Sequence, residues 1–473
     1  MRRGLAGSVL AALVLALPPF SFARELPATV KAELARAGVP LAAVGVVVEP
    51  VEGGSALVSM NADKPLNPAS VMKLFTTYAG LDLLGPAFTF KTQLIVTGEL
   101  RNGVLQGDLV IRGGGDPKLT YDRIWKMVHQ LRSRGVQEIR GDVVLDRTYF
   151  APLVHDPSKF DGDTRRAYNV GPDALLANFK AIDFRFVPTD EGIRVFGEPD
   201  LPNVTIASRL TPVKEPCGAW RRNLRHEIEE TGLLATVVFT GTYPVDCGEK
   251  SWALSVFDGD RYFESAFRWA WSEAGGKIFG KVRPGTRPTE ARLLYIEESN
   301  PLAELVRDIN KFSNNVMARQ LFLALSAEKL GTPGEAKASA LVIAEWLRQK
   351  DIRAPELSIE NGAGLSRADR ASAATLAALL KSAWASPVMP ELVSSLPVFA
   401  LDGTFKNTRS AAAGQAHIKG GTLTGVQAIA GFVRDTKGQR WIVVMMANHE
   451  NANRAQPAMD ALVEWVQRGK GAN

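Results

Sequence analysis

The first residues with clear chemical potential lie in the stretch Asn67–Thr77, where Ser70 precedes Lys73 by three residues. Apolar residues at positions 71, 74, 75, 78, 81 and 84 follow helical spacing after Pro68, which predicts a helix with Ser70 at its N-terminus. Residues three apart share one helix face, so Lys73 is expected beside Ser70. A lysine whose pKa is lowered by burial or by cationic neighbours can deprotonate a serine hydroxyl and make it a nucleophile. The free N–H groups of a helix N-terminus can help to hold an oxyanion.

The same Ser-x-x-Lys pair occurs again at Ser326 and Lys329, inside the apolar-periodic segment 317–330. We interpret this second copy as an ordinary helix surface. A solvated helix face is also a reasonable interpretation of either copy when it is considered alone. What distinguishes Ser70 is the presence of further motifs along the chain.

Two more short motifs carry hydroxyl, amide and ammonium groups. Ser313-Asn314-Asn315 opens a predicted helix over 313–329, and Ser313 taken alone suits an N-cap. Lys419-Gly420-Gly421-Thr422 stands at the end of a predicted strand, and taken alone it is a glycine-rich turn with a surface lysine. Each motif by itself is more often structural than functional. The order Ser-x-x-Lys, Ser-x-Asn and Lys-x-Gly is much harder to reach by chance.

In this order the motifs resemble those of the penicilloyl-serine transferases, which include the penicillin-binding proteins and the serine β-lactamases. Ser70 and Ser313 are 313 − 70 = 243 residues apart, far more than a compact β-lactamase-like domain needs. Such an insertion resembles the low-molecular-mass class C (type-4) penicillin-binding proteins, the D-alanyl-D-alanine carboxypeptidase/endopeptidase family. Other segments similar to that family are Gly113–Pro117, Gly141-Asp142, Gly364–Arg367 and Leu401–Thr404.

The resemblance implies a hydrolase that cleaves peptidoglycan stem peptides through an acyl-enzyme and takes β-lactams as covalent inhibitors. It implies that Ser70 is the nucleophile and Lys73 the base that activates it. Ser313 would relay a proton to the leaving D-alanine nitrogen, and Asn315 would bind the amide on the acyl side. Nothing in the sequence identifies a separate base for deacylation, so a water activated by Lys73 is expected.

The resemblance also implies binding roles. Lys419 would attract the terminal carboxylate, and the third motif, with Gly421 and Thr422, would line the substrate site. The backbone N–H groups of Ser70 and Thr422 would form the oxyanion hole. An aspartate of the inserted segment, Asp163 or Asp161, would receive the cationic end of the stem peptide.

Gly420 departs from the family pattern, because the third motif is normally Lys-Thr-Gly or Lys-Ser-Gly. The hydroxyl that would bind the substrate carboxylate is therefore missing. A lost charge-assisted hydrogen bond costs about 1.5–3 kcal/mol, which corresponds to roughly 10- to 150-fold in affinity or rate. This loss could weaken removal of a terminal D-alanine more than cleavage of a cross-link. Alternatively, Thr422 or Thr424 could supply the hydroxyl through a shifted turn.

The elements that must position these residues lie at both ends of the chain. Residues 42–50 and 55–60 predict a β-hairpin, and strands over 415–419, 426–434 and 439–446 need partners. We therefore predict an α/β (α+β) fold of the β-lactamase/transpeptidase type, with an antiparallel sheet flanked by helices. Its domain would be discontinuous, formed by residues 24–88 and 290–473. Residues 89–289 would form a β-rich insertion of two subdomains.

The first 23 residues predict a secretory signal peptide. Arg2 and Arg3 precede the apolar run Val9–Leu17, and Ser21-Phe22-Ala23 suits a cleavage site. The apolar run is too short to span a bilayer, and no later run reaches that length. We expect a periplasmic or secreted protein without an integral membrane segment after signal removal.

Composition excludes several other classes of function. The net charge of +6 is mild for 473 residues, and no basic run with interleaved aromatic residues suggests a nucleic-acid partner. The five histidines are scattered, and no metal site or cofactor is predicted. Cys217 and Cys247 either close a disulfide loop in an oxidising compartment or remain two separate thiols.

Two alternatives to a DD-peptidase stay open at this point. A serine β-lactamase shares the motifs but requires fast deacylation, and the long gap between the first two motifs argues against it. A non-catalytic cell-wall-binding homologue is suggested mainly by Gly420.

Overall fold

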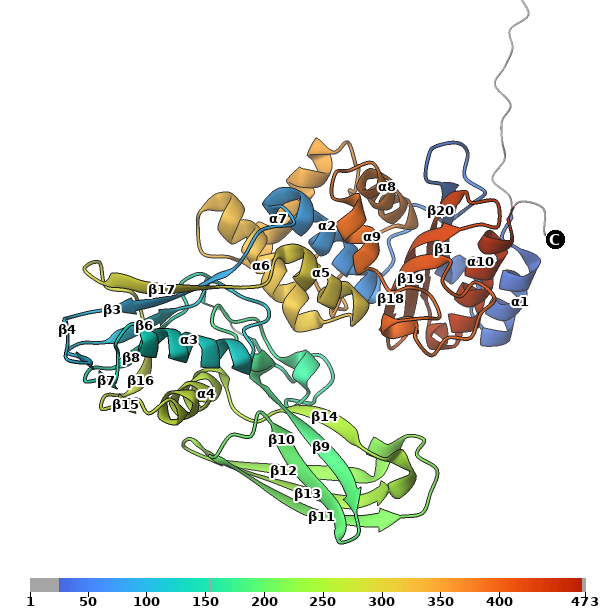
Figure 1. The fold of residues 1–473 in the computed structure, drawn as a ribbon. Helices are drawn as coiled ribbons and strands as arrows, with labels where there is room; N and C mark the ends of the chain where they lie inside the picture. The colour runs from blue at the N-terminus through green and yellow to red at the C-terminus, as the bar shows by residue number, and fades with distance from the viewer. Residues whose placement is uncertain (1–24, 153–154, 470–473) are drawn as a thin grey trace, which may run out of the picture.

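A computed structural model describes residues 25–152 and 155–469 of this chain. The signal peptide predicted for residues 1–23 lies outside the described residues. No helix in the described ranges is long and apolar enough to cross a membrane. The ribbon has a large right-hand body made from both ends of the chain, and the middle of the chain extends from it to the left and below (Figure 1).

The central sheet of the body joins strands from the two ends of the chain. Its five strands run in the order β18-β19-β20-β1-β2, and every pair is antiparallel. They are β1 (Val44–Pro50), β2 (Val58–Met60), β18 (Ala416–Leu423), β19 (Val426–Arg434) and β20 (Arg440–Asn448). The predicted hairpin is confirmed, with Val48 opposite Val58. Most residues of β1, β19 and β20 are buried, because both faces of the sheet are covered.

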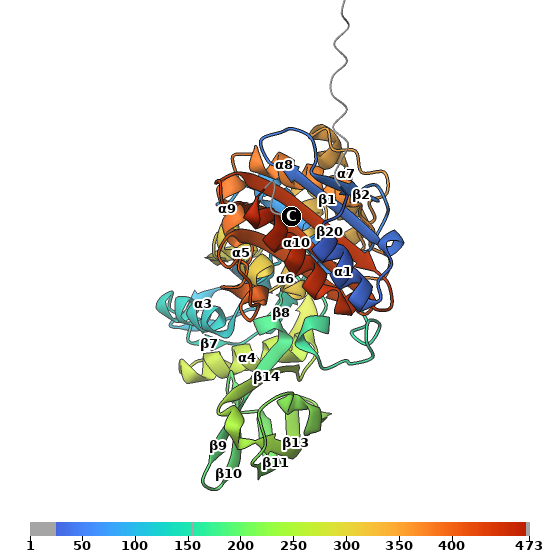
Figure 2. The ribbon, with the colours of Figure 1, turned by 90° about the vertical axis from the view of Figure 1, so that its right-hand side faces the viewer.

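One face of the sheet is covered by the two terminal helices α1 (Ala28–Ala37) and α10 (Gln456–Arg468), which lie in front of β1 and β20 in Figure 2. The other face packs against a layer of helices. These are α2 (Lys73–Leu84), α5 (Leu302–Lys311), α6 (Asn315–Leu330), α7 (Ala336–Gln349), α8 (Ala373–Trp384) and α9 (Met389–Ser395). Residues 73–81 of α2 are all buried, so α2 is the interior helix of this layer. The helix begins at Lys73, and the preceding residues Ala69–Met72 form a 3-10 turn, whereas the sequence pattern predicts the helix to begin at Ser70.

The part of the insertion nearest the body contains two sheets and two helices. A five-stranded sheet has the order β16-β8-β6-β3-β17, and a smaller one the order β15-β7-β5-β4. The elements are β3 (Lys91–Val96), β4 (Leu100–Arg101), β5 (Val104–Leu105), β6 (Leu109–Arg112), α3 (Tyr121–Ser133), β7 (Glu138–Ile139), β8 (Val143–Asp146), α4 (Gly259–Glu273), β15 (Lys277–Ile278), β16 (Val282–Gly285) and β17 (Arg292–Glu298).

Two three-stranded sheets form the lower lobe of Figure 1, in the orders β10-β9-β14 and β11-β13-β12. Their strands are β9 (Ala181–Thr189), β10 (Gly192–Glu198), β11 (Val204–Val213), β12 (Leu224–Thr231), β13 (Leu234–Pro244) and β14 (Lys250–Ser255). The Cys217–Cys247 pair forms a disulfide in this lobe, which decides the question that the sequence leaves open. In this lobe, β-like runs at 182–187, 202–208, 234–240 and 252–256 predict β9, β11, β13 and β14, whereas β10 and β12 have no such run. β12 is polar at alternate positions and mostly exposed on one face, so it lacks a continuous apolar run.

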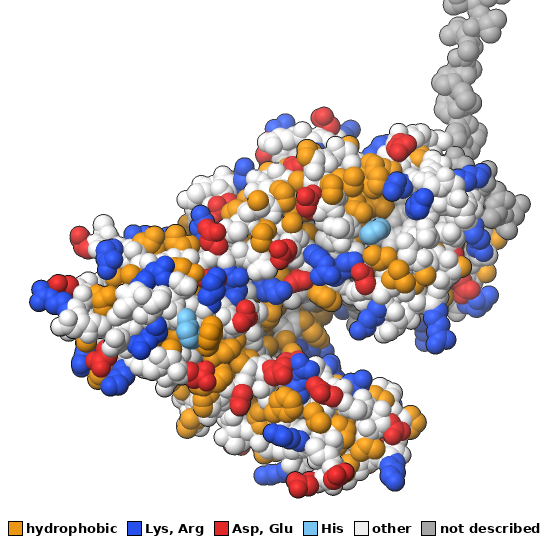
Figure 3. Space-filling model, viewed as in Figure 1, with side chains coloured by type: hydrophobic (Ala, Val, Ile, Leu, Met, Phe, Trp, Pro, Cys, Tyr) orange, Lys and Arg blue, Asp and Glu red, His pale blue; other side chains and the backbone are white. Residues whose placement is uncertain are grey.

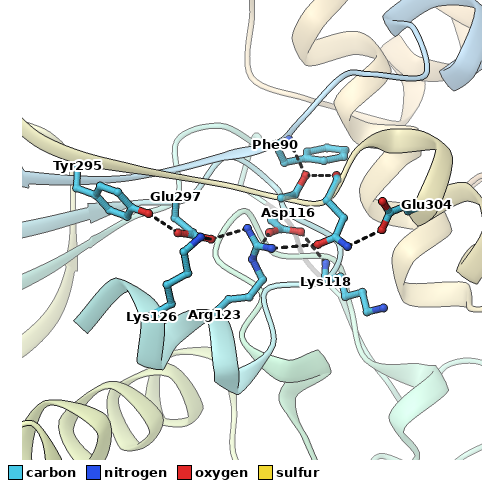
Figure 4. A network of polar contacts seen from close by, with 10 residues as sticks. Phe90, Asp116, Lys118, Arg123, Lys126, Tyr295, Glu297 and Glu304 are labelled. Carbon is cyan, nitrogen blue, oxygen red and sulfur yellow. Dashed lines mark hydrogen bonds and ion pairs between the residues drawn. The ribbon is translucent and has the colours of Figure 1, made fainter. Parts of the chain in front are cut away.

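The insertion is tied to the body by a network of buried charges at the two crossing segments (Figure 4). The amide N–H of Phe90 on the outgoing segment donates to Ser299 Oγ on the returning one at 2.9 Å. Arg123 donates to Glu297 at 2.6 Å, and Glu297 is only 1% exposed. Burial raises the pKa of the nearby Asp116 to about 6. Arg123 also donates to Asn300 Oδ1 at 3.1 Å, and Asn300 donates to Glu304 of α5 at 2.6 Å, so the network links the insertion to the helix layer that carries the candidate site.

The predicted fold class is confirmed by this architecture and by the structural neighbours described below. We propose that residues 24–88 and 290–473 form one domain and that residues 89–289 form two subdomains. Support comes from the pairing of β1 with β20 and from the separate sheets of the lobe. β17 departs from these bounds, because it follows residue 290 and yet pairs with β3 in the sheet of the insertion. One apolar cluster nevertheless runs through both parts of the insertion, from Leu94 to Phe239 and Trp271.

Candidate active site

The 3-10 turn that carries Ser70 is held from both sides by polar contacts. Asn67 Oδ1 accepts the N–H of Ala69 at 2.8 Å, and Asn448 at the end of β20 binds both backbone groups of Asn67. Ala69 has a φ of 47°, a left-handed conformation that is strained for alanine. A Cβ on Gly364 would lie 1.9 Å from the Ala69 carbonyl oxygen, so the loop around Gly364 packs directly on this turn. These contacts fix the backbone conformation of the turn that carries the half-buried Ser70.

The Lys73 side chain reaches three acceptors from three parts of the chain. Its Nζ lies 3.0 Å from Ser70 Oγ, 2.6 Å from Asn315 Oδ1 and 2.5 Å from the Ala363 carbonyl oxygen. An ammonium group satisfies all three acceptors. A neutral amine can keep two N–H bonds, to Asn315 and Ala363, and turn its lone pair to the Ser70 hydroxyl. The site therefore directs the lone pair of a neutral Lys73 amine at the Ser70 hydroxyl.

The electrostatic surroundings of Lys73 favour its neutral form. Lys73 is fully buried, and burial holds its pKa well below the usual range, with Lys419 and Arg319 adding repulsion. The carboxyl of Asp369 acts in the opposite direction. Burial raises the pKa of Asp369 to about 7, so this carboxyl is substantially protonated at neutral pH and does little to keep Lys73 charged.

The second motif lies at the turn between α5 and α6. Ser313 has a φ of 55° and is not the N-cap, because Asn314 caps α6 by accepting the Met317 N–H at 3.1 Å. The Ser313 hydroxyl therefore does not cap α6, although the position of Ser313 in the sequence predicts that role. Instead, Ser313 Oγ accepts a hydrogen bond from Lys419 Nζ at 2.9 Å. The second and third motifs meet at this contact.

The third motif lies within the edge strand β18 and not in a turn, because β18 continues to Leu423. Lys419 is fully buried, and burial lowers its pKa to about 7. A Cβ on Gly421 would lie 2.6 Å from the Pro68 carbonyl oxygen and 2.9 Å from the Ser70 amide nitrogen. Glycine at 421 therefore lets the strand approach the backbone of the 3-10 turn Ala69–Met72, which carries the proposed nucleophile Ser70 and is called the nucleophile turn below. This close approach brings the backbone of β18 at Gly421 next to the N–H of Ser70.

Gly420 packs against an aromatic ring. A Cβ at this position would lie 3.1 Å from Phe405 Cζ, so the ring must give by a few tenths of an ångström for any side chain. The Thr422 hydroxyl contacts Gln427 Oε1 at 3.1 Å. The sequence suggests Thr422 or Thr424 as a substitute hydroxyl, and that suggestion stays a prediction.

Asp163 and Asp161 lie in the insertion. Asp163 lines the same groove as Ser313 and Asn315, but its oxygens accept the Arg165 N–H at 3.0 Å and Arg166 Nε at 2.8 Å. Asp161 binds Arg166, Tyr168 and Asn169. Either carboxylate would have to exchange these partners for a substrate ammonium group, and the assignment stays a prediction.

The Asn361–Ser366 loop is the part of the site that motif analysis does not assign. Besides the Ala363 carbonyl at Lys73, the Gly362 carbonyl accepts the Thr76 hydroxyl at 2.7 Å. Its glycines are a recognisable signal, since Gly362 and Gly364 have φ of 69° and 75°. A backbone carbonyl acting as a lysine acceptor has no side-chain signature, so the pattern could not reveal it.

The second Ser-x-x-Lys copy is not the exposed helix face that we predict. Ser326 is fully buried, and its hydroxyl contacts Ser339 at 2.8 Å and the Glu335 backbone. The packing of α6 against α7 buries it. Lys329 is exposed, so this pair does not form a serine–lysine contact site.

Comparisons with known proteins give the family. The model of the D-Ala-D-Ala carboxypeptidase 3 (S13) family matches residues 26–469. The chain belongs to this family. It is therefore an enzyme of a serine peptidase family, and the predicted penicillin-binding protein resemblance is confirmed.

Curated relatives cover most of the chain. The D-alanyl-D-alanine carboxypeptidase DacB of Haemophilus influenzae is 26% identical over 426 residues, covering 86% of this chain and 85% of the relative. A D-alanyl-D-alanine carboxypeptidase of Actinomadura sp. is 29% identical over 421 residues, covering 86% of this chain and 78% of the relative.

A solved structure shows the same fold. Penicillin binding protein 4 (dacB) from Haemophilus influenzae superposes with a TM-score of 0.75 at 21% identity, covering 93% of this chain and 100% of that chain.

Proposed function

We propose that this S13 family member is a serine DD-peptidase that hydrolyses the D-alanyl-D-alanine ends or D-alanyl cross-links of peptidoglycan stem peptides. The observation that carries the proposal is the 3.0 Å contact between Lys73 Nζ and Ser70 Oγ, made by a buried lysine of lowered pKa. Support also comes from the relatives named as D-alanyl-D-alanine carboxypeptidases. The β-lactamase and wall-binding alternatives gain no support from these relatives.

Acylation follows from the contacts. Neutral Lys73 takes the Ser70 proton while Ser70 Oγ attacks the D-alanyl carbonyl carbon. The developing oxyanion lies near the N–H groups of Ser70 and Thr422, and each such donor typically contributes about 2.7–4 kcal/mol. Ser313, bound to Lys419, passes a proton to the leaving nitrogen as the C–N bond breaks.

The remaining contacts bind and orient the substrate. The Asn315 amide holds Lys73 through Oδ1, which leaves its NH₂ group for the acyl-side amide. Lys419 supplies positive charge for the substrate carboxylate. In deacylation, Lys73 removes a proton from a water that attacks the ester on Ser70, and the Ser70 hydroxyl is regenerated. No cofactor takes part in these steps.

The same nucleophile accounts for β-lactam sensitivity. Opening of the lactam by Ser70 leaves an ester whose amine cannot depart, so a stable penicilloyl adduct is expected. The Haemophilus influenzae neighbour has also been solved in complex with a β-lactam. Rapid turnover of nitrocefin would instead favour a β-lactamase.

We further propose that the chain acts outside the cytoplasm, in a periplasm or after secretion. The leader pattern of residues 1–23 and the Cys217–Cys247 disulfide support this location.

The experiment for this proposal is a D-alanine release assay. The purified protein is incubated with a stem pentapeptide ending in D-alanyl-D-alanine, and with a cross-linked dimer of the same stem. Release of D-alanine or of monomer, lost in Ser70→Ala, is the expected result. Cleavage of neither substrate would contradict it.

We expect a bell-shaped pH dependence of kcat/KM for peptide cleavage. Activity rises as Lys73 loses its proton and falls as Lys419, whose pKa burial lowers to about 7, becomes neutral. In Lys419→Arg the cation cannot titrate, so the descending limb should disappear up to about pH 9. Rates measured between about pH 5 and 9 on both proteins check this, and an unchanged descending limb would exclude Lys419 as its source.

The role of the missing hydroxyl at position 420 is tested by Gly420→Ser with Gly420→Ala as the matched control. Both variants place a Cβ against Phe405, and only serine adds the hydroxyl. We expect serine to exceed alanine by about tenfold or more in kcat/KM on the pentapeptide, as one charge-assisted hydrogen bond predicts. Equal rates for the two variants would show that no carboxylate contact is missing here.

A further inference from the structure

A groove of about 820 Å³ runs from the Ser313 turn to the lower lobe of the insertion. Phe312–Val316 line one side, and Leu224–His226 with Trp252 line the other. In the space-filling view the molecule is hollowed between the lobe and the body above it (Figure 3). The proposed reaction uses the Ser313–Asn315 end of this groove, and Asp163, the residue predicted for the cationic end of the stem peptide, lines it as well but is paired with Arg166. The length of the groove beside Arg221 and Arg225 has no assigned ligand.

Two arginines of the lobe keep unneutralised charge at this groove. Arg221 and Arg225 are both exposed, and within the described residues neither forms an ion pair with a carboxylate. Arg221 donates to the Ser251 carbonyl at 2.7 Å and lies over the rings of Trp220 and Trp252. In the part of the chain that the structure describes, the hydrogen bonds of Arg225 go to the backbone carbonyls of Arg222 and Leu224. Neutral groups therefore hold both guanidinium groups in place. The carboxylate of Asp183 favours the charged form of Arg221 from a distance, but it pairs with Arg185 and forms no ion pair with Arg221, so both guanidinium groups can bind a ligand carboxylate.

The other charged groups of the groove cancel one another. Arg166 pairs with Asp163, the one carboxylate among the lining residues, and also with Asp161, which does not line the groove. Burial lowers the pKa of His226, so this imidazole is neutral at pH 7. The excess charge of the groove is thus positive and comes from Arg221 and Arg225. A ligand with carboxylates complements it.

The groove also presents aromatic rings to solvent. Phe312, directly before Ser313, is 64% exposed, and Tyr168 is 40% exposed. Exposed large rings of this kind commonly mark a binding surface, where they provide apolar contact for a flexible chain. A peptide that carries carboxylates matches both the rings and the arginines.

The position of Ser313 decides which part of the substrate lies here. In the proposed reaction Ser313 gives its proton to the leaving nitrogen, so the leaving group departs on the side of Ser313. A single D-alanine needs only the space beside Lys419. In a cross-link the leaving group is a whole second stem peptide, which bears free carboxylates and continues beyond the reacting atoms.

We infer that this groove receives the leaving stem peptide of a cross-linked substrate, with Arg221 and Arg225 binding its carboxylates. The inference rests on the proposed DD-peptidase function and adds a preference for cross-links over free stem ends. Cleavage of the cross-link forms and breaks the same kinds of bond as the acylation step described above. The Ser70 Oγ–carbon bond forms, the carbon–nitrogen bond to the second stem breaks, and the Ser70 proton ends on that nitrogen by way of Lys73 and Ser313. Water then hydrolyses the ester.

The test compares a purified cross-linked muropeptide dimer with a monomeric pentapeptide of the same stem. In Arg221→Gln/Arg225→Gln, the ratio of dimer to monomer kcat/KM is expected to fall about tenfold. Arg225→Gln alone keeps the Arg221–Trp252 packing and is expected to give part of this fall. Arg222→Gln is the matched control, because Arg222 is an exposed arginine of the same turn that does not line the groove.

An equal loss on both substrates, or the same fall in Arg222→Gln, would overturn the inference. An unchanged ratio of dimer to monomer kcat/KM in both groove variants would also overturn the inference. Penicillin acylation of the wild-type protein distinguishes failure of the proposed function from failure of the groove assignment. A protein that forms no penicilloyl adduct refutes the proposed function, whereas a protein that forms the adduct but shows an unchanged ratio refutes only the groove.

Discussion

Replacing Lys73 with methionine is expected to lower the rate of penicillin acylation by about 10²- to 10⁴-fold, the usual contribution of a positioned general base. The amine is the group at 3.0 Å from Ser70 Oγ. Methionine has a similar length and no charge, so it should pack in this buried site without unfolding the protein. Stopped-flow acylation kinetics measures the effect, and the thermal midpoint checks the fold.

Lys329→Met is the matched control for Lys73→Met. It changes the lysine of the second Ser-x-x-Lys copy, which is exposed and makes no serine contact of the Lys73 type. This variant should acylate at the wild-type rate. If Lys73→Met also kept that rate, Lys73 would not be the base that activates Ser70.

A single methyl group at Gly421 is expected to lower acylation about 10²- to 10³-fold, the cost of losing one oxyanion-hole donor. The added Cβ would lie 2.6 Å from the Pro68 carbonyl and 2.9 Å from the Ser70 amide nitrogen. Both neighbours are backbone atoms, so β18 must move away from the nucleophile turn. The movement separates the two N–H groups that are proposed to hold the oxyanion. Gly421→Ala in the same acylation assay measures this effect.

Gly420→Ala is the control that distinguishes displacement of β18 from the Ser70 backbone from a general disruption of β18. Its Cβ meets the Phe405 ring, a side chain that can shift, and not the backbone of the nucleophile turn. Gly420→Ala should therefore lose much less activity than Gly421→Ala. Equal losses would show that the close approach of Gly421 to Ser70 is unimportant for the reaction.

The convergence of the three motifs could be predicted from the sequence because each is local in the chain. Helical spacing places Lys73 beside Ser70, and the strand pattern of 415–446 pairs with the N-terminal hairpin. The order of the motifs then supplies the long-range information through the family resemblance. The contacts of Lys73 with Asn315 and of Lys419 with Ser313 agree with that expectation.

The remaining features depend on tertiary packing, which local patterns do not encode. The Ala363 carbonyl at Lys73 is a backbone group, and any residue there would provide it. The raised pKa of Asp369 results from burial, which only the fold determines. Ser313 resembles an N-cap in the sequence, but in the structure it has a φ of 55° and Asn314 is the residue that caps α6. Likewise, the place of Phe405 beside Gly420 comes from a distant turn.

Burial of two lysines is the feature on which the mechanism depends. Lys73 and Lys419 are both fully buried, and burial lowers the pKa of each. Their mutual repulsion favours a state in which one is charged and the other neutral. With Lys73 neutral and Lys419 charged, the site would hold both the base proposed for Ser70 and the cation proposed for the substrate carboxylate at the same pH.

The account is tested most directly by intact-protein mass spectrometry after incubation with benzylpenicillin. The wild-type protein is predicted to gain the mass of one penicillin, attached to the peptide that contains Ser70. Ser70→Ala is predicted to gain none. Absence of the adduct on the wild-type protein, or an adduct that survives in Ser70→Ala, would contradict the assignment of Ser70 as a nucleophile activated by Lys73.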